Sequence, residues 1–117
     1  MFTPDRTYEV VVYRLHADTG AGYPPLAEAA DAFLRTQPGF VSRQILQDKE
    51  DLAVFLDVVT WETRAAAEAA QQAVQHAPAM QPFLTAIERV LSFGHYHLYA
   101  GGEPDALNAR TVQIEAV

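Results

Sequence analysis

The chain has 117 residues, of which 50% are hydrophobic and 20% are charged, a size and composition that fit one globular domain. It contains no cysteine, which excludes disulfides, thiolate nucleophiles and zinc or iron–sulfur sites built on cysteine. Its formal charge is −7, and its few lysines and arginines are scattered, which argues against binding to nucleic acid or to anionic membranes.

The N-terminal segment Met1–Arg6 lacks the basic stretch followed by an apolar run that a secretion signal needs. The composition is also too interrupted by charge for a membrane span. We therefore expect a cytoplasmic protein that binds neither nucleic acid nor membranes. Its partners should be small molecules or proteins.

The first two elements predicted are a strand and a helix. Residues 7–15 are rich in β-branched and aromatic side chains, with polar groups at the margins, which is typical of a strand covered on both faces. A loop with glycines and prolines follows, and residues 25–36 begin with a proline, which suits a first helical turn. Apolar side chains then recur at helical spacing and form one stripe, made of Leu26, Ala29, Ala30, Phe33 and Leu34.

A hairpin is predicted next. Pro38-Gly39 ends the helix, and residues 40–48 alternate between two faces as a strand does. A polar turn over 48–51 leads into residues 52–61, the most strand-like segment of the chain. These two strands should be antiparallel neighbours.

The rest of the chain predicts two helices and a last strand. Thr63 is suited to cap an alanine-rich helix over residues 64–76. Residues 79–89 predict a short helix with Pro82 in its first turn, and residues 90–99 predict a fourth strand. The order β-α-β-β-α-β indicates an α+β fold of ferredoxin-like type, in which four strands form one antiparallel sheet with both helices on one face.

Such a sheet has a second face that no helix covers. Because its strands are apolar on both sides, we expect a second copy of the chain to cover that face in a homodimer. The ferredoxin-like domain should span residues 1–100. Residues 101–117 should form a C-terminal linker and an additional edge strand over Thr111–Val117, which pairs within the chain or with the partner.

Several segments resemble the antibiotic-biosynthesis monooxygenase-like family of dimeric α/β barrels. They are Pro38–Val41, Phe55–Thr63, Ala66–Ala70 and the strand with His95-Tyr96-His97, and the resemblance extends over residues 7–99. It implies a homodimer in which two sheets close into a barrel, with a pocket between sheet and helices in each subunit. Members similar to this chain include cofactor-free oxygenases of aromatic polyketides, haem-degrading enzymes, quinol oxygenases and many proteins without known activity.

Two features of that family bear on the chemistry. The oxygenases and haem-degrading members use an asparagine on the sheet beside a tryptophan. Trp61 matches the tryptophan, whereas the single asparagine of this chain, Asn108, lies outside the matching segments. Haem-binding members also place their ligand histidine on the second helix, closer behind the tryptophan than His76 lies here.

The third strand offers two candidate site residues. Asp57 lies on the same strand face as Phe55 and Trp61, and a carboxylate among such neighbours should have a raised pKa and could take a proton from a phenol. Trp61 would form an apolar wall for a flat aromatic ligand. The alternatives are a tryptophan that serves only the core and a carboxylate paired with Arg14 or Arg43.

His95 and His97 project from one face of the last strand, together with Phe93 and Tyr99. Two imidazoles at this spacing could share a metal or act as acid and base. No third ligand can be placed, so we predict neither a metal site nor a cofactor. The alternative is packing or interface hydrogen bonding. Tyr13, on the first strand, is interpreted first as packing and second as a pocket hydroxyl.

Two functions are compatible with these residues. The first is a cofactor-independent monooxygenase that acts on a small aromatic substrate in a pocket between sheet and helices, by removing a proton so that the anion reacts with dioxygen. The second is a non-catalytic dimeric module that binds a small ligand or another protein. The catalytic candidates are Asp57, His95 and His97, and the candidates for substrate contacts are Trp61, Tyr13, Phe55 and Phe93.

Overall fold

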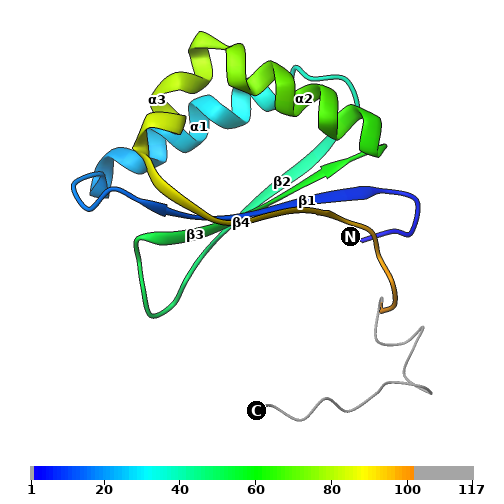
Figure 1. Ribbon diagram of the computed structural model, residues 1–117, viewed down its shortest axis with the longest axis horizontal. Helices are drawn as coiled ribbons and strands as arrows, with labels where there is room; N and C mark the ends of the chain where they lie inside the picture. Colours follow the sequence, from blue (N-terminus) through cyan, green and yellow to red (C-terminus); the bar gives the residue numbers. More distant parts are fainter. Residues whose placement is uncertain (1, 102–117) are drawn as a thin grey trace.

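The computed structural model describes residues 2–101 (Figure 1). Its strands are β1 (Thr7–Leu15), β2 (Phe40–Gln47), β3 (Val54–Trp61) and β4 (Ile87–Tyr96), and its helices are α1 (Tyr23–Leu34), α2 (Arg64–His76) and α3 (Gln81–Ala86). Two short 3-10 turns, η1 (Gly20–Gly22) and η2 (Pro78–Met80), precede α1 and α3. The additional edge strand predicted over Thr111–Val117 lies outside the described residues.

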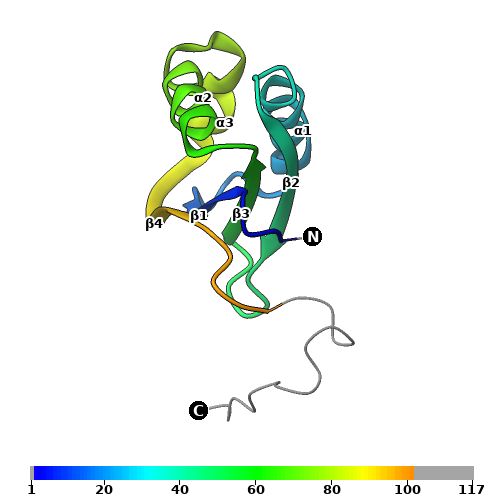
Figure 2. The ribbon, with the colours of Figure 1, turned by 90° about the vertical axis from the view of Figure 1, so that its right-hand side faces the viewer.

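The strands form one antiparallel sheet in the order β2-β3-β1-β4. The helices all lie on one side of this sheet (Figure 1). Viewed from its end, α1 stands over the β2 side, whereas α2 and α3 stand over the β4 side (Figure 2). The predicted ferredoxin-like topology with an antiparallel four-stranded sheet is confirmed.

Local signals account well for two elements. Strand β1 and helix α2 have the predicted bounds. Thr63 caps α2, since its hydroxyl accepts a hydrogen bond from the backbone N–H of Ala66 at 3.0 Å, which satisfies one of the free donors at a helix start. Helix α1 begins at Tyr23, two residues before the predicted start, because Pro24 and Pro25 both fit within a first helical turn.

The prediction for the segment before the last strand was wrong. Residues 87–89 belong to β4 and not to a helix, because Ile87 and Arg89 pair with Leu15 and Arg14 of β1. Pairing with a neighbouring strand thus overrides the local helical pattern. The strand also ends at Tyr96, so that His97 follows it instead of forming part of it.

The turn between α1 and β2 depends on Gly39. Its φ of 84° lies in the left-handed region that favours glycine. A Cβ at this position would come within 2.5 Å of the Cβ of Ala66. The turn therefore brings the start of β2 close to the first turn of α2, an approach that only glycine permits.

The core lies between the sheet and the helices. Two clusters of buried residues fill it: one is made of Tyr13, Leu15, Tyr23, Ala27, Ala30, Met80 and Phe83, and the other of Leu34, Val59, Trp61, Ala67 and Ala70. The alanines lie on the inner faces of α1 and α2 and let both helices approach the strands closely. Within residues 2–101, none of the helices has the length and apolar character needed to cross a membrane.

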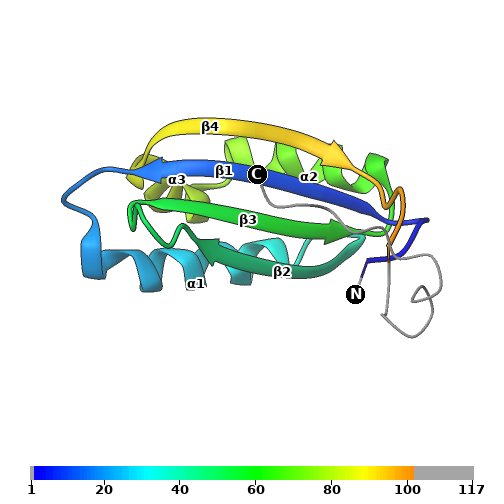
Figure 3. The same ribbon diagram turned by 90° about the horizontal axis from the view of Figure 1, so that it is seen from below.

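The opposite face of the sheet carries no helix in the described part of the chain, and Figure 3 shows its four strands from that side. By strand register, the apolar side chains on this open face include Val10, Val12, Leu46, Leu56, Val58 and Tyr96. Leu46 and Tyr96 are more than half exposed. The open face is therefore as apolar as the sequence predicts.

Candidate functional site

A cavity of about 270 Å³ lies between the helical side of the sheet and the helices. All four strands line it, together with α1, α2, η2 and α3. Most of its wall is apolar, and its polar side chains are Glu9, Tyr13, Arg43, Asp57, Gln71 and Gln75. Val90 and Phe93 of β4 and Gln75 of α2 line the cavity and are also exposed, so that the cavity reaches solvent between β4 and α2.

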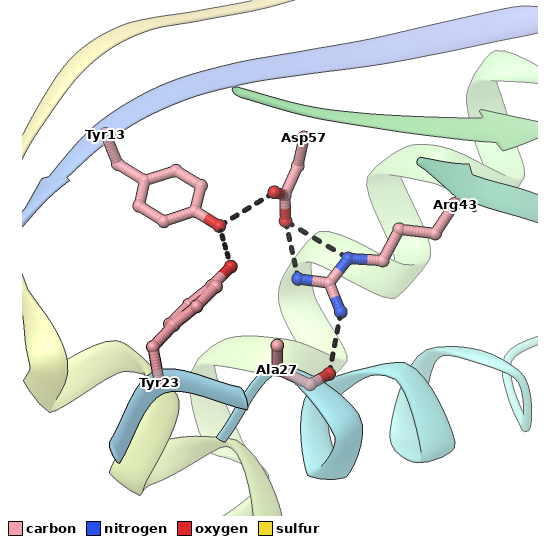
Figure 4. A network of polar contacts seen from close by, with 5 residues as sticks. All are labelled: Tyr13, Tyr23, Ala27, Arg43 and Asp57. Atoms are coloured by element: carbon pink, nitrogen blue, oxygen red, sulfur yellow. Dashed lines mark hydrogen bonds and ion pairs between the residues drawn. The ribbon is translucent and has the colours of Figure 1, made fainter. Parts of the chain in front are cut away.

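Asp57 is the centre of a buried polar network (Figure 4). Its Oδ2 accepts hydrogen bonds from Nη2 and Nε of Arg43, at 2.6 and 3.1 Å, and its Oδ1 accepts one from the Tyr13 hydroxyl at 2.7 Å. The Tyr13 and Tyr23 hydroxyls are 2.5 Å apart, and Nη1 of Arg43 donates to the carbonyl of Ala27 at 3.0 Å. Both Asp57 oxygens are thus occupied by donors.

This network keeps Arg43 charged and Tyr13 neutral. Burial opposes the charged form of Arg43, but the adjacent Asp57 carboxylate and its hydrogen bonds outweigh that penalty and raise the pKa of the guanidinium. Burial, reinforced by the Asp57 charge, raises the pKa of the Tyr13 phenol far above its usual range. Tyr13 is therefore a neutral donor to Asp57. Of the two partners considered for Asp57, the structure selects Arg43, while Arg14 pairs with Asp51.

A second carboxyl group, that of Glu9, lies in the cavity wall beside Trp61. The indole Nε1–H of Trp61 donates to Oε1 of Glu9 at 3.0 Å, and the Trp61 side chain is fully buried. Burial raises the pKa of Glu9, the hydrogen bond from Trp61 opposes this, and the negative charge of Asp57 adds to it. Glu9 is thus a partly buried carboxyl group whose proton affinity exceeds that of an exposed glutamate.

His95 is the neighbour of Glu9 across the β1–β4 pair. Its ring meets that of Phe93 edge-on, with centroids 5.4 Å apart. Its Nε2 is buried and has no hydrogen-bond partner among the described residues, which is an uncommon state for a buried polar atom.

The structure brings together some of the predicted site residues and separates others. Asp57, Trp61, Tyr13 and Phe93 line the cavity, and His95 lies on the strand face beside it. Phe55 packs on Tyr23, with ring centroids 4.4 Å apart, and contributes nothing to the described cavity wall. His97 follows the end of β4 and is exposed. Within residues 2–101, no three His, Asp or Glu side chains are grouped so as to hold a metal ion.

Sequence reasoning gave no site role to Glu9. The available signal was its position: it lies between Tyr8 and Val10 near the start of the first strand, and alternation places it on the face of Tyr13. A charge at such a position is costly unless it is paired or functional. That argument does not identify Trp61 as its partner, because the two residues lie 52 positions apart in the chain.

The fold and the cavity define a ferredoxin-like domain with an internal, largely apolar cavity. The model of the family described as "Antibiotic biosynthesis monooxygenase" matches residues 8–82. The chain belongs to this antibiotic biosynthesis monooxygenase family.

Solved structures with the same fold support the assignment of the architecture. SnoaB from Streptomyces nogalater, a cofactor-independent oxygenase solved as a mutant, has a TM-score of 0.67 and 20% identity over 83% of this chain and 96% of that one. A putative antibiotic biosynthesis monooxygenase from Nitrosomonas europaea has a TM-score of 0.66 and 17% identity, over 87% and 99%. Another from Bordetella bronchiseptica has a TM-score of 0.73 and 12% identity, over 82% and 99%. No curated protein matches the chain.

Proposed function

We propose that the protein is a cofactor-independent monooxygenase that acts on a small aromatic substrate in the cavity between sheet and helices. The observation that carries the proposal is the cavity itself, with its apolar walls, the buried ring of Trp61 and the partly buried carboxyl group of Glu9. Its volume of about 270 Å³ is near the lower end of ligand sites, which favours a small ligand. The likeness to SnoaB, described as a cofactor-independent oxygenase, supports the same reaction class.

The reaction needs a substrate that becomes electron-rich when it loses a proton. A basic group in the cavity removes a proton from a ring CH₂ flanked by aromatic rings, as in an anthrone, and the carbanion forms a C–O bond with dioxygen. Protonation gives a hydroperoxide, which loses water to leave a ketone. The CH₂ group and O₂ thus become C=O and H₂O: the carbon gives up four electrons and dioxygen takes them.

The cavity residues have distinct roles in this proposal. Trp61, Tyr13 and Phe93 contact the ring of the substrate. Asp57 holds Arg43 and Tyr13 in the wall, since both of its oxygens are engaged. A carboxylate that only stabilises the structure needs hydrogen-bond donors at both oxygens. The occupied oxygens of Asp57 therefore also favour the second candidate function, a binding module without catalysis.

Oxygen consumption separates the two functions. An oxygen electrode should record uptake above the uncatalysed rate with at least one member of a panel of anthrones and hydroquinones. Gln71→Trp, which puts an indole into the cavity from α2, should reduce that rate at least tenfold. Its matched control, Gln72→Trp on the exposed side of the same helix, should not. Uptake absent across the panel, or equal in both variants, would contradict catalysis in this cavity.

We also propose that two copies of the chain pair through their open sheet faces. The side chains Val10, Val12, Leu56 and Val58 lie together there, and apolar patches of this kind mark protein contacts. Light scattering at micromolar concentration should give twice the mass of one chain. A stable monomer would contradict the homodimer.

A further inference from the structure

We propose that Glu9 is the group that accepts the proton of the substrate in this cavity, with Trp61 as the residue that positions it. The inference rests on the proposed oxygenase function and adds to it the identity of the base. Glu9 lines the cavity, is held in place by Trp61 and, within the described chain, has one oxygen free to contact a ligand. None of the site residues predicted from the sequence combines these three properties.

The two oxygens of Glu9 are in different situations. Oε1 accepts the hydrogen bond from the Trp61 indole, whose N–H can only donate. No hydrogen bond within residues 2–101 reaches Oε2, and the residue lines the cavity. The carboxyl group is therefore held at one oxygen and available to a ligand at the other. Asp57 differs, because protein donors occupy both of its oxygens.

The charged and titratable groups around Glu9 also favour this role. Arg43 of β2 is already bound to Asp57 of β3, so that it does not neutralise Glu9. Tyr13 of β1 is a neutral donor to Asp57, His95 is the neighbour on β4, and α2 contributes uncharged glutamines. Burial and the Asp57 charge raise the pKa of Glu9, which makes it a stronger base than an exposed carboxylate.

The step conserves charge within the cavity. The C–H or O–H bond of the substrate breaks, a new O–H bond forms on Oε2, and the electron pair stays on the substrate as a carbanion or phenolate. The negative charge moves from Glu9 to the aromatic ring beside Trp61. The proton then returns to the oxygen adduct and leaves in the water that the reaction produces.

The experiment compares Glu9→Gln with Glu28→Gln, which makes the same chemical change at an exposed position of α1. In oxygen-uptake assays, Glu9→Gln should lower kcat/KM by about 100-fold or more and remove the acidic limb of its pH profile, whereas Glu28→Gln should change neither. A Glu9→Gln enzyme with wild-type kcat/KM and an unchanged limb would overturn the assignment while leaving the oxygenase function intact. The assignment would also be overturned if His95→Gln lost activity while Glu9→Gln kept it.

A second readout does not need turnover. 4-Nitrophenol absorbs visible light as its phenolate, so that its spectrum in the cavity reports the pKa of the bound phenol. An ionised Glu9 in contact with the probe should raise that pKa by charge repulsion. Near the pKa of the free phenol, less of the bound probe should therefore be phenolate in the wild type than in Glu9→Gln. If no substrate consumes oxygen, the proposed function fails, and this comparison still decides the role of Glu9: equal spectra overturn it.

Unfolding at several pH values tests the same carboxyl group through stability. Because the folded-state pKa of Glu9 is raised, its contribution is fully present below the ordinary pKa of 4.5 and is lost as pH rises through the raised value. As pH rises from 4.5 through the raised pKa of Glu9, the free energy of unfolding of the wild type should therefore fall relative to that of Glu9→Gln. Parallel curves for the two proteins would contradict a Glu9 whose pKa is raised in the folded state.

Discussion

Arg43→Met should lower the free energy of unfolding by about 3–5 kcal/mol, measured by urea denaturation at a fixed protein concentration. The Arg43 side chain is 1% exposed and that of Asp57 is 8% exposed. Without the guanidinium, the Asp57 carboxylate stays in an apolar interior with only Tyr13 as a donor. An uncompensated buried charge of this kind is among the costliest single changes in a protein.

The matched control is Arg14→Met. Arg14 also pairs with an aspartate, Asp51, at 2.6 Å, but the side chains of that pair are 36% and 45% exposed. Loss of such an exposed, solvent-screened pair should have little effect on stability. A double variant, Arg43→Met with Asp57→Leu, should recover much of the lost stability, because it removes the stranded charge. Equal losses in Arg43→Met and Arg14→Met would refute the importance of burial here.

Trp61→Ala should have the second large effect, a loss of about 3–5 kcal/mol of stability, as expected for truncation of a buried aromatic side chain. Trp61 is completely buried and meets Phe40 edge-on at 5.7 Å. The same change removes the donor to Glu9 and the flat wall of the cavity. It should therefore also abolish measurable binding of aromatic ligands.

Trp61→Phe separates these contributions, because it keeps an aromatic ring and loses only the indole N–H and part of the volume. Its stability loss should be smaller than that of Trp61→Ala, and it should still bind aromatic ligands. Tyr99→Ala is the control, since this ring is 95% exposed and its truncation should cost no more than about 0.5 kcal/mol. Ligand binding that survives in Trp61→Ala would contradict the role of Trp61 as a wall of the site.

The fold could be predicted from the sequence because its signals are local and periodic. The apolar first strand and the capped, alanine-rich helix after Thr63 were predicted with the bounds that the structure has. The start of β4 could not be predicted in this way. Residues 87–89 continue the local helical pattern of the residues before them, but their conformation is decided by pairing with Arg14 and Leu15, more than 70 positions away.

The site was predictable only in part, for a related reason. Strand alternation correctly placed Asp57 with Trp61 and allowed a pairing with Arg43, but it gave no means of choosing between Arg43 and Arg14. Alternation also grouped His97 with His95, although β4 ends before His97. The contact between Glu9 and Trp61 joins two strands through side chains, and the pattern of neither strand contains it.

The neutralised guanidinium has a consequence for which molecules can enter. Arg43 is the one cationic side chain among the described residues that line the cavity, and Asp57 already balances its charge. A carboxylate or sulfonate ligand would lose its hydration shell in the cavity and find no free cation in the described part of the wall to replace it. It would also be repelled by the negative charge of Glu9. For the proposed function, this charge balance predicts that the cavity accepts weak acids in their uncharged form and excludes analogues of the same shape that are already ionised in water.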